Sequence, residues 1–64
     1  MKNIVRTLRQ QKGWTQQQLG ERLGVSRQAV IAIENGRFDP SLPVALRLAL
    51  LFERPVEQIF ELEP

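Results

Sequence analysis

The sequence predicts an all-α fold of five short helices, and three observations support this prediction. Apolar residues recur at helical spacing in five segments, and each segment is bounded by a capping residue, a glycine or a proline. The 64 residues match one small domain, and 42% of them are apolar, enough for a hydrophobic core. The chain contains no cysteine and no histidine, which excludes disulfide bridges and the usual zinc sites.

The first helix is expected over residues 3–12, where Val5 and Leu8 lie on one face among polar residues. Gly13 is well suited to end this helix, because glycine adopts the left-handed conformation without strain. Trp14 follows as an apolar plug between two helices, and we expect it to pack in the core.

The second helix is expected to begin after Thr15 and to run to about Leu23. Thr15 and Gln18 form the pattern of a capping box, in which each side chain bonds the backbone amide of the other residue. Leu19 and Leu23 are four residues apart and face inward. Gly20 lies inside the helix, where glycine is unfavourable, and we expect another helix to cross closely at that point.

The third helix is expected to follow a short turn that contains Gly24, with Ser26 as its cap. Two helices joined in this way, over about residues 15–34, have the helix-turn-helix pattern. The inner face of the third helix carries the apolar residues Ala29, Val30 and Ile33. Its outer face carries Arg27, Gln28, Ile31 and Ala32, a residue mix suited to reading base edges in a DNA major groove. Ile31 fits either contact with a thymine methyl group or packing inside the protein.

The fourth and fifth helices are expected between about residues 42 and 60. Asn35-Gly36 ends the third helix, and Ser41 caps a fourth helix that is apolar nearly all round, from Leu42 to Phe52. Pro55 precedes a short fifth helix, and the alternation in residues 61–63 is compatible with a short terminal strand.

A helix that is apolar on all sides is either buried or paired with a partner. We expect one stripe of the fourth helix to face the core of its own domain: Leu42, Ala45, Leu46, Ala49 and Phe52. The remaining apolar residues are then the expected homodimer interface: Val44, Leu48, Leu50 and Leu51. The fourth and fifth helices would together carry the dimer contact.

Charge is distributed unevenly along the chain. Residues 1–37 hold seven cations and two anions, for a net charge of +5, whereas residues 38–64 have a net charge of −3. This asymmetry indicates a polyanion on one side, although it also fits ordinary solubilising surface charge. No apolar run is long enough to span a bilayer and no signal peptide opens the chain, so a cytoplasmic protein is expected.

The sequence holds no arrangement that indicates an enzyme. It lacks a pair of catalytic carboxylates, a cluster of metal ligands and a glycine-rich phosphate loop that follows a strand. We therefore expect no cofactor, no metal and no small-molecule ligand.

Most of the chain resembles a known family. The segment TQQQLGERLGVSRQAVIAIENGRFDPSL is similar to the Xre/Cro-repressor family of helix-turn-helix transcriptional regulators, and PVALRLALLFERPVEQIF continues the likeness to its short, cytolysin-repressor-like members. The resemblance implies a five-helix, lambda-repressor-like domain. It also implies a sequence-specific repressor that binds a palindromic operator in double-stranded DNA as a homodimer.

The resemblance assigns roles to individual residues. It places Ser26, Arg27, Gln28 and Ala32 at base-reading positions, and Ile31 lies on the same face. The residues matched to phosphate or backbone contact are Gln16, Asn35, Gly36 and Arg37, with Arg9 as a further candidate. Arg9 and Glu34 also match a pair that ties the first helix to the end of the recognition helix.

The sequence departs from the family pattern at three places. Ile31 replaces a common serine or asparagine, Glu53-Arg54 replaces a common Gly-Val, and Leu50 replaces a common polar residue.

The apolar fourth helix also fits a second function, that of an antitoxin-like module that binds another protein. A salt-sensitive shift on duplex DNA favours the regulator, and a stable heterocomplex without DNA affinity favours the module.

Overall fold

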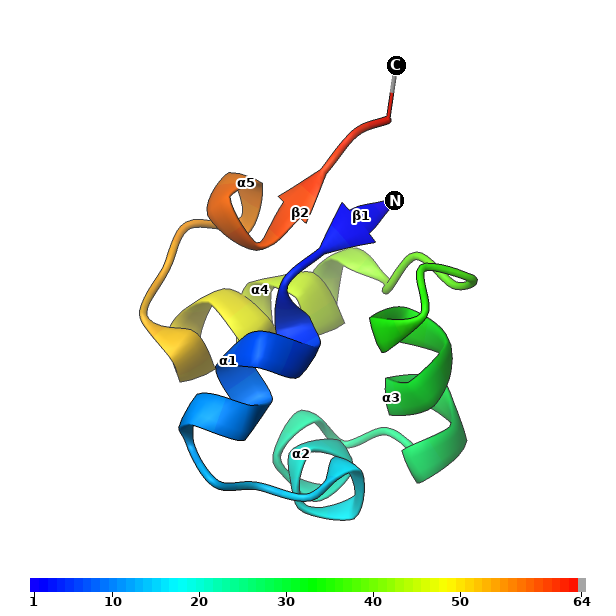
Figure 1. The fold of residues 1–64 in the computed structure, drawn as a ribbon, viewed down its shortest axis with the longest axis vertical. Helices are drawn as coiled ribbons and strands as arrows, with labels where there is room; N and C mark the ends of the chain where they lie inside the picture. Colours follow the sequence, from blue (N-terminus) through cyan, green and yellow to red (C-terminus); the bar gives the residue numbers. More distant parts are fainter. Residues whose placement is uncertain (64) are drawn as a thin grey trace.

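The computed structural model describes residues 1–63, and Pro64, the last residue of the expected domain, lies outside the described residues. Figure 1 shows the predicted set of five helices together with a two-stranded sheet near the chain ends. The elements are β1 (Lys2–Asn3), α1 (Val5–Gln11), α2 (Gln16–Leu23), α3 (Arg27–Glu34), α4 (Leu42–Phe52), α5 (Val56–Ile59) and β2 (Phe60–Glu61). The prediction of a mostly helical fold with a short terminal strand is confirmed.

Hydrogen-bonding side chains begin three of the helices, as the sequence predicts. The Thr15 hydroxyl accepts from the Gln18 amide at 3.0 Å, and the Gln18 side chain accepts from the Thr15 amide at 2.9 Å. Ser26 caps α3 and Ser41 caps α4 through their hydroxyl groups. These contacts satisfy amides at the helix N-termini that have no partner within the helix.

The sheet pairs the two ends of the chain, and it corrects the bounds of two predicted helices. Lys2 pairs with Glu61 and Asn3 with Phe60, in antiparallel register. Helix α1 therefore begins at Val5 rather than at residue 3, and α5 ends one residue before Phe60. Local periodicity indicated a strand near the C-terminus but neither the strand at Lys2–Asn3 nor the pairing, because each strand is two residues long and its partner lies at the opposite end of the sequence.

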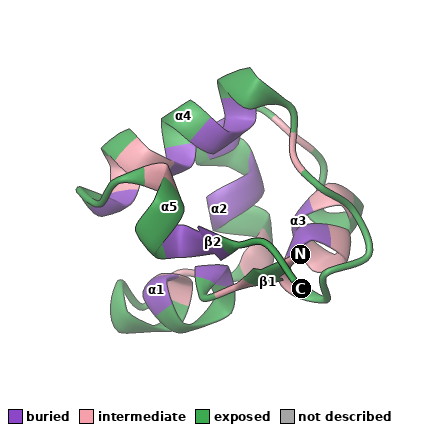
Figure 2. Cartoon of the chain, turned by 90° about the horizontal axis from the view of Figure 1, so that it is seen from above, coloured by how far each residue is buried: buried purple, intermediate pink, exposed green. Residues whose placement is uncertain are grey.

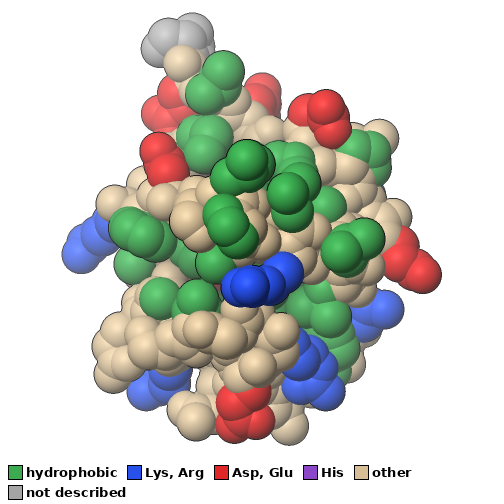
Figure 3. All heavy atoms as spheres, turned by 180° about the vertical axis from the view of Figure 1, so that it is seen from behind, with side chains coloured by type: hydrophobic (Ala, Val, Ile, Leu, Met, Phe, Trp, Pro, Cys, Tyr) green, Lys and Arg blue, Asp and Glu red, His purple; other side chains and the backbone are tan. Residues whose placement is uncertain are grey.

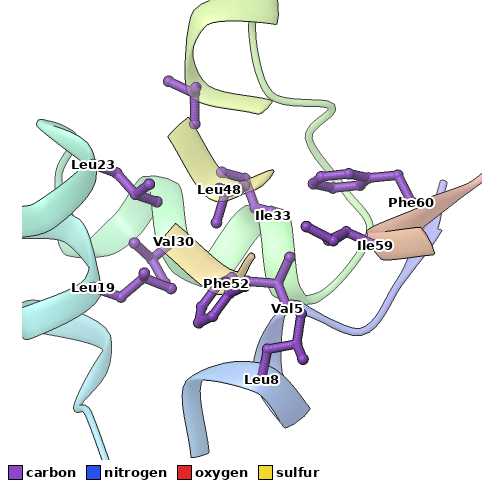
Figure 4. Close-up of a cluster of buried hydrophobic side chains, with 11 residues drawn as sticks. Val5, Leu8, Leu19, Leu23, Val30, Ile33, Leu48, Phe52, Ile59 and Phe60 are labelled. Atoms are coloured by element: carbon purple, nitrogen blue, oxygen red, sulfur yellow. The ribbon is translucent and has the colours of Figure 1, made fainter. Parts of the chain in front are cut away.

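One hydrophobic core joins all five helices (Figures 2 and 4). Its buried members are Val5, Leu8, Leu19, Leu23, Val30, Ile33, Val44, Leu48, Phe52, Ile59 and Phe60. Trp14 is partly buried against this cluster, and its ring lies 6.0 Å from that of Phe52. The Arg22 guanidinium lies 4.2 Å above the Trp14 ring, in cation–π geometry.

The predicted orientation of α4 is wrong in part: Ala45 and Phe52 are each 7% exposed and face the core as expected, but four other positions differ from the prediction. Val44 and Leu48 are 8% and 0% exposed and pack in the core of their own chain, so they cannot form a dimer surface. Leu42 and Leu46, which were expected to face inward, are 69% and 50% exposed. A helix that is apolar on all sides has no polar face to fix its rotation, so its packing against α2 and α5 decides which face is buried.

Arg47 marks the orientation that α4 adopts. Its guanidinium donates a 3.2 Å hydrogen bond to the carbonyl of Leu23, the last residue of α2. A cation at a helix C-terminus is favourable, because it satisfies a free carbonyl and opposes the partial negative charge there. This contact holds α4 across the end of α2.

Candidate DNA interface

Helices α2 and α3 are held together by a tight turn that depends on Gly20. A side chain at this position would place its first carbon 2.8 Å from the Val25 carbonyl oxygen, too close for any residue but glycine. The close neighbour is thus the turn before α3, and not a crossing helix as the sequence suggested. Gly24 ends α2 with φ of 75°, and the Val25 amide bonds back to the Gly20 carbonyl at 3.0 Å. The turn therefore fixes α3 against α2.

Helix α3 has the two faces that the sequence predicts. Val30 and Ile33 are 1% and 2% exposed and anchor the helix to the core. Arg27 and Gln28, in the first turn, are exposed, while Ile31 and Ala32 are partly exposed. The outer face thus presents a long cation and an amide at the helix N-terminus, beside two apolar groups.

Ser26 caps α3 through its hydroxyl oxygen and can still form another hydrogen bond. Its hydroxyl oxygen accepts a 3.1 Å hydrogen bond from the Ala29 amide. The hydroxyl proton is not used by this bond, and the residue is exposed. Ser26 can therefore donate to a phosphate or a base acceptor while it caps α3.

Glu34, at the end of α3, is the centre of a polar network. Its carboxylate is 0% exposed and is bound by Arg9, with 2.6 Å between Arg9 Nε and Glu34 Oε2. The Gln16 amide nitrogen lies 3.2 Å from Glu34 Oε1, and Arg6 Nε lies 3.5 Å from the same oxygen. Arg9 also donates to the Trp14 carbonyl at 2.8 Å. One carboxylate thus ties together α1, the first residue of α2 and the last residue of α3.

The environment of Glu34 keeps it ionised. Burial by itself raises the pKa of this carboxyl, since an apolar environment disfavours the charged form. Hydrogen bonds from Arg9, Gln16 and Arg6, together with the positive charge of Arg9, outweigh that effect and hold the pKa below its ordinary value of 4.5. Glu34 is therefore a fixed acceptor at neutral pH.

Two of the expected phosphate contacts belong to this network. Arg9 is only 11% exposed and its guanidinium bonds both Glu34 and Trp14, so its position does not support the expected phosphate contact. Gln16 uses its amide nitrogen for Glu34, but that group has a second proton. Gln16 is partly exposed at the start of α2, and it can donate to a phosphate without leaving Glu34.

The loop after α3 presents its groups to solvent in a fixed arrangement. Gly36 has φ of 73°, and the Arg37 amide bonds back to the Ala32 carbonyl at 3.0 Å. The Arg6 guanidinium donates to Asn35 Oδ1 at 2.9 Å. Because a guanidinium can bond only the oxygen of an amide, Arg6 leaves the Asn35 nitrogen free to donate outward.

The sequence reasoning did not identify Arg6 or Asn3 as supports for this loop. The available signal for Arg6 was its position three residues before Arg9, a spacing that puts two helical residues on one face. The Asn3 amide nitrogen donates to the Ile33 carbonyl at 2.8 Å, and its oxygen accepts from the Val5 amide at 3.1 Å. The role of Asn3 has no sequence signal, since it depends on a strand that periodicity does not show.

These residues form a surface that can bind a polyanion. It combines the first turn of α3, the start of α2 and the loop at residues 35–37. Within residues 1–63 no group of three or more acidic, histidine or cysteine side chains is arranged to hold a metal ion. Across the same described part of the chain, no helix is long and apolar enough to cross a membrane.

A family model described as helix-turn-helix matches residues 5–59, which is most of the chain. The chain belongs to the helix-turn-helix family. Members of this family are DNA-binding transcriptional regulators, and this chain is one of them. The resemblance inferred from the sequence is confirmed.

Relatives of this helix-turn-helix protein occur in bacteria and archaea. It is 48% identical over 63 residues to the uncharacterized HTH-type transcriptional regulator YgzD of Bacillus subtilis, covering 98% of this chain and 96% of that one. It is 47% identical over 60 residues to an uncharacterized HTH-type transcriptional regulator of Methanocaldococcus jannaschii, covering 94% and 91% of the two chains.

Solved structures share the fold. The restriction-modification controller protein C.AhdI of Aeromonas hydrophila superimposes with a TM-score of 0.75 at 32% identity, covering 88% of this chain and 85% of that one. The hypothetical transcription factor NHTF of Neisseria gives a TM-score of 0.73 at 30% identity, over 84% of this chain and 61% of that one. The arrangement of α2 and α3 is thus that of known helix-turn-helix regulators.

Proposed function

We propose that this protein is a sequence-specific repressor, which binds a palindromic operator in double-stranded DNA as a homodimer in the cytoplasm. The observation that carries the proposal is the exposed first turn of α3, held on a rigid turn beside donors on α2 and the 35–37 loop. We propose that residues 1–64 act as one domain and need no cofactor.

Base reading is assigned to the outer face of α3. Arg27 is long enough to bond both acceptors of a guanine, and Gln28 suits the donor and acceptor of an adenine. Ser26 donates its free hydroxyl proton, and the apolar side chains of Ile31 and Ala32 contact thymine methyl groups. The partial exposure of Ile31 is compatible with this role.

Phosphate binding is assigned to the groups beside that face. The side-chain amide of Gln16 is held in place by Glu34, and that of Asn35 is held by Arg6. Each amide nitrogen keeps a proton that can be donated to a phosphate. The Arg37 side chain is exposed and supplies charge, and Gly36 allows the loop to approach the DNA backbone closely. Contacts of this kind position a protein on DNA without selecting the sequence.

The dimer contact is assigned to the exposed side of α4. In place of Val44 and Leu48, the structure leaves Leu42, Leu46 and Leu50 on the surface, and Leu51 is partly exposed. Burying such side chains stabilises by about 1.5–3 kcal/mol each, a large share of the stability of a small domain. A twofold dimer would place two α3 helices about 34 Å apart, one turn of DNA.

Selection of bound duplexes from a random pool tests the proposal. We expect a palindromic consensus whose half-site centres are one helical turn apart, and binding that weakens steeply with salt. A consensus without twofold symmetry would contradict the homodimer, and no enrichment at all would contradict sequence-specific binding.

The exposed leucines of α4 also support a second function, that of an antitoxin-like module which binds another protein. The two functions use different surfaces. A heterocomplex that is abolished by Leu50→Glu but not by Arg27→Ala, in a protein without measurable duplex binding, would favour this second function.

A further inference from the structure

A shallow groove lies where α4 meets α5, on the face that Figure 3 shows with several hydrophobic side chains together. Leu46, Ala49, Leu50 and Pro55 make it largely apolar, and Glu53 and Arg54 complete its lining. We infer that a second copy of this chain docks in this groove, and that Glu53 of each copy pairs with Arg54 of the other. The inference rests on the homodimer proposed above and adds the contact that aligns the two copies.

Glu53 adopts a backbone conformation that its residue type disfavours. Its φ is 56°, and within residues 1–63 it is the one residue other than glycine with a positive φ. It ends α4, and its amide bonds back to the Ala49 carbonyl. Glycine fills such helix ends without strain, whereas a glutamate here adopts a conformation that its side chain disfavours. A strained residue of this kind points to a role for its side chain.

Among the described residues, the Glu53 side chain has no ion-pair partner that would explain such a role. Glu53 and Arg54 are both exposed, and within the described residues neither side chain takes part in an ion pair. Two opposite charges therefore lie unpaired at a groove whose leucines, Leu46 and Leu50, are 50% and 80% exposed.

The combination of charges identifies the partner as a second copy. In a twofold contact the same surface meets itself, so each charged group must face one of opposite sign. Adjacent Glu53 and Arg54 meet this condition, because each copy supplies both members of the pair. DNA would be repelled by Glu53, and the face belongs to the acidic part of the chain.

The test compares reversed charges in the native chain by sedimentation equilibrium without DNA. Glu53→Arg and Arg54→Glu should each weaken dimerisation, by about ten-fold, because each places like charges together at both symmetric contacts. The double variant Glu53→Arg/Arg54→Glu should recover most of the native affinity. Glu21→Arg, which makes the same change in charge on α2, should have little effect.

Glu53→Gly separates the role of the side chain from that of the backbone. It should raise the denaturant midpoint of the monomer at low protein concentration, because the strain is removed, and it should still weaken dimerisation. A stabilised variant that dimerises as tightly as the native chain would overturn the inference.

The outcomes distinguish this inference from the proposed homodimer. A native dimer in which the two reversals act no more strongly than Glu21→Arg would overturn the groove contact and leave the homodimer standing. A failure of the double variant to recover would show that the two side chains do not pair. A native chain that is monomeric at all concentrations would overturn both, and the groove would then serve a different protein.

Discussion

The end of α3 and the exposed side of α4 differ in whether their side chains have partners within the chain. At the end of α3, the Glu34 side chain is fully buried and is bound by Arg9, Gln16 and Arg6 of the same chain. Along α4, Leu42, Leu46 and Leu50 have large exposed surfaces, and the charges beside them are unpaired. The buried carboxylate thus finds its partners within the chain, whereas the α4 face leaves apolar and charged groups exposed and available for contact with another molecule.

The largest expected effect tests which side of α4 belongs to the core. Leu48→Ala should lower the free energy of unfolding by about 2–5 kcal/mol, because Leu48 is fully buried and its loss leaves a cavity. Leu50→Ala is the matched control on the same helix, and at 80% exposure it should change the monomer by less than about 0.5 kcal/mol. Urea titration at a concentration that keeps the protein monomeric measures both. Equal losses would mean that α4 is rotated relative to the structure.

The next largest effect tests how much the Glu34 network contributes to stability. Glu34→Gln should cost about 1.5–3 kcal/mol, because it removes charged hydrogen bonds and leaves Arg9 without its counterion. The exposed Glu21→Gln, on α2, is the matched control and should be nearly neutral. A native-like midpoint for Glu34→Gln would show that the network contributes little.

The pH dependence of stability follows from the same carboxylate. Because the pKa of Glu34 is lowered in the folded state, its contribution is fully present above the unfolded value of 4.5 and is lost as the pH falls through the lower folded value. The difference in unfolding free energy between the native chain and Glu34→Gln should therefore shrink as the pH falls below 4.5 and through the lower folded pKa. A constant difference over that range would contradict the lowered pKa.

The smallest expected effect concerns the orientation of Asn35. Arg6→Ala should weaken duplex binding several-fold, whereas Arg6→Gln, which can still donate to Asn35 Oδ1, should retain more affinity at an unchanged salt slope. If Arg6 instead touches a phosphate, both variants should reduce the salt slope by about one unit. With Asn35 already replaced by alanine, Arg6→Ala should have little further effect.

The sequence predicted those parts of the fold that local chemistry determines. The capping box at Thr15, the Ser26 and Ser41 caps and the glycine ends are predicted from a few neighbouring residues, and the α3 faces follow from the helical spacing of its apolar residues. The orientation of α4 was not predictable, because its apolar residues surround the helix. The terminal sheet and the Asn3 contact join residues about 30 or more apart in sequence, which periodicity does not report.

In the proposed interface, too, local sequence predicted some residues, and contacts between distant residues determined the others. Arg27 and Gln28 were identified because their positions on α3 follow from helical phase. The Arg9–Glu34 pair implied by the family resemblance is present in the structure, at 2.6 Å. The sequence did not show that Arg9 also bonds the Trp14 carbonyl, or that Arg6 fixes Asn35, since both facts depend on how the elements pack in three dimensions. Residues whose role is to face outward were easier to predict than residues that hold them in place.

The central claim is that the exposed first turn of α3 reads DNA sequence. The direct measurement is the affinity of the native chain and of Arg27→Ala for the selected operator and for a random duplex at the same salt concentration. We expect Arg27→Ala to weaken operator binding by about 1–3 kcal/mol and to weaken random binding far less. Equal weakening on both duplexes would show that Arg27 contacts only phosphate, and would contradict the claim.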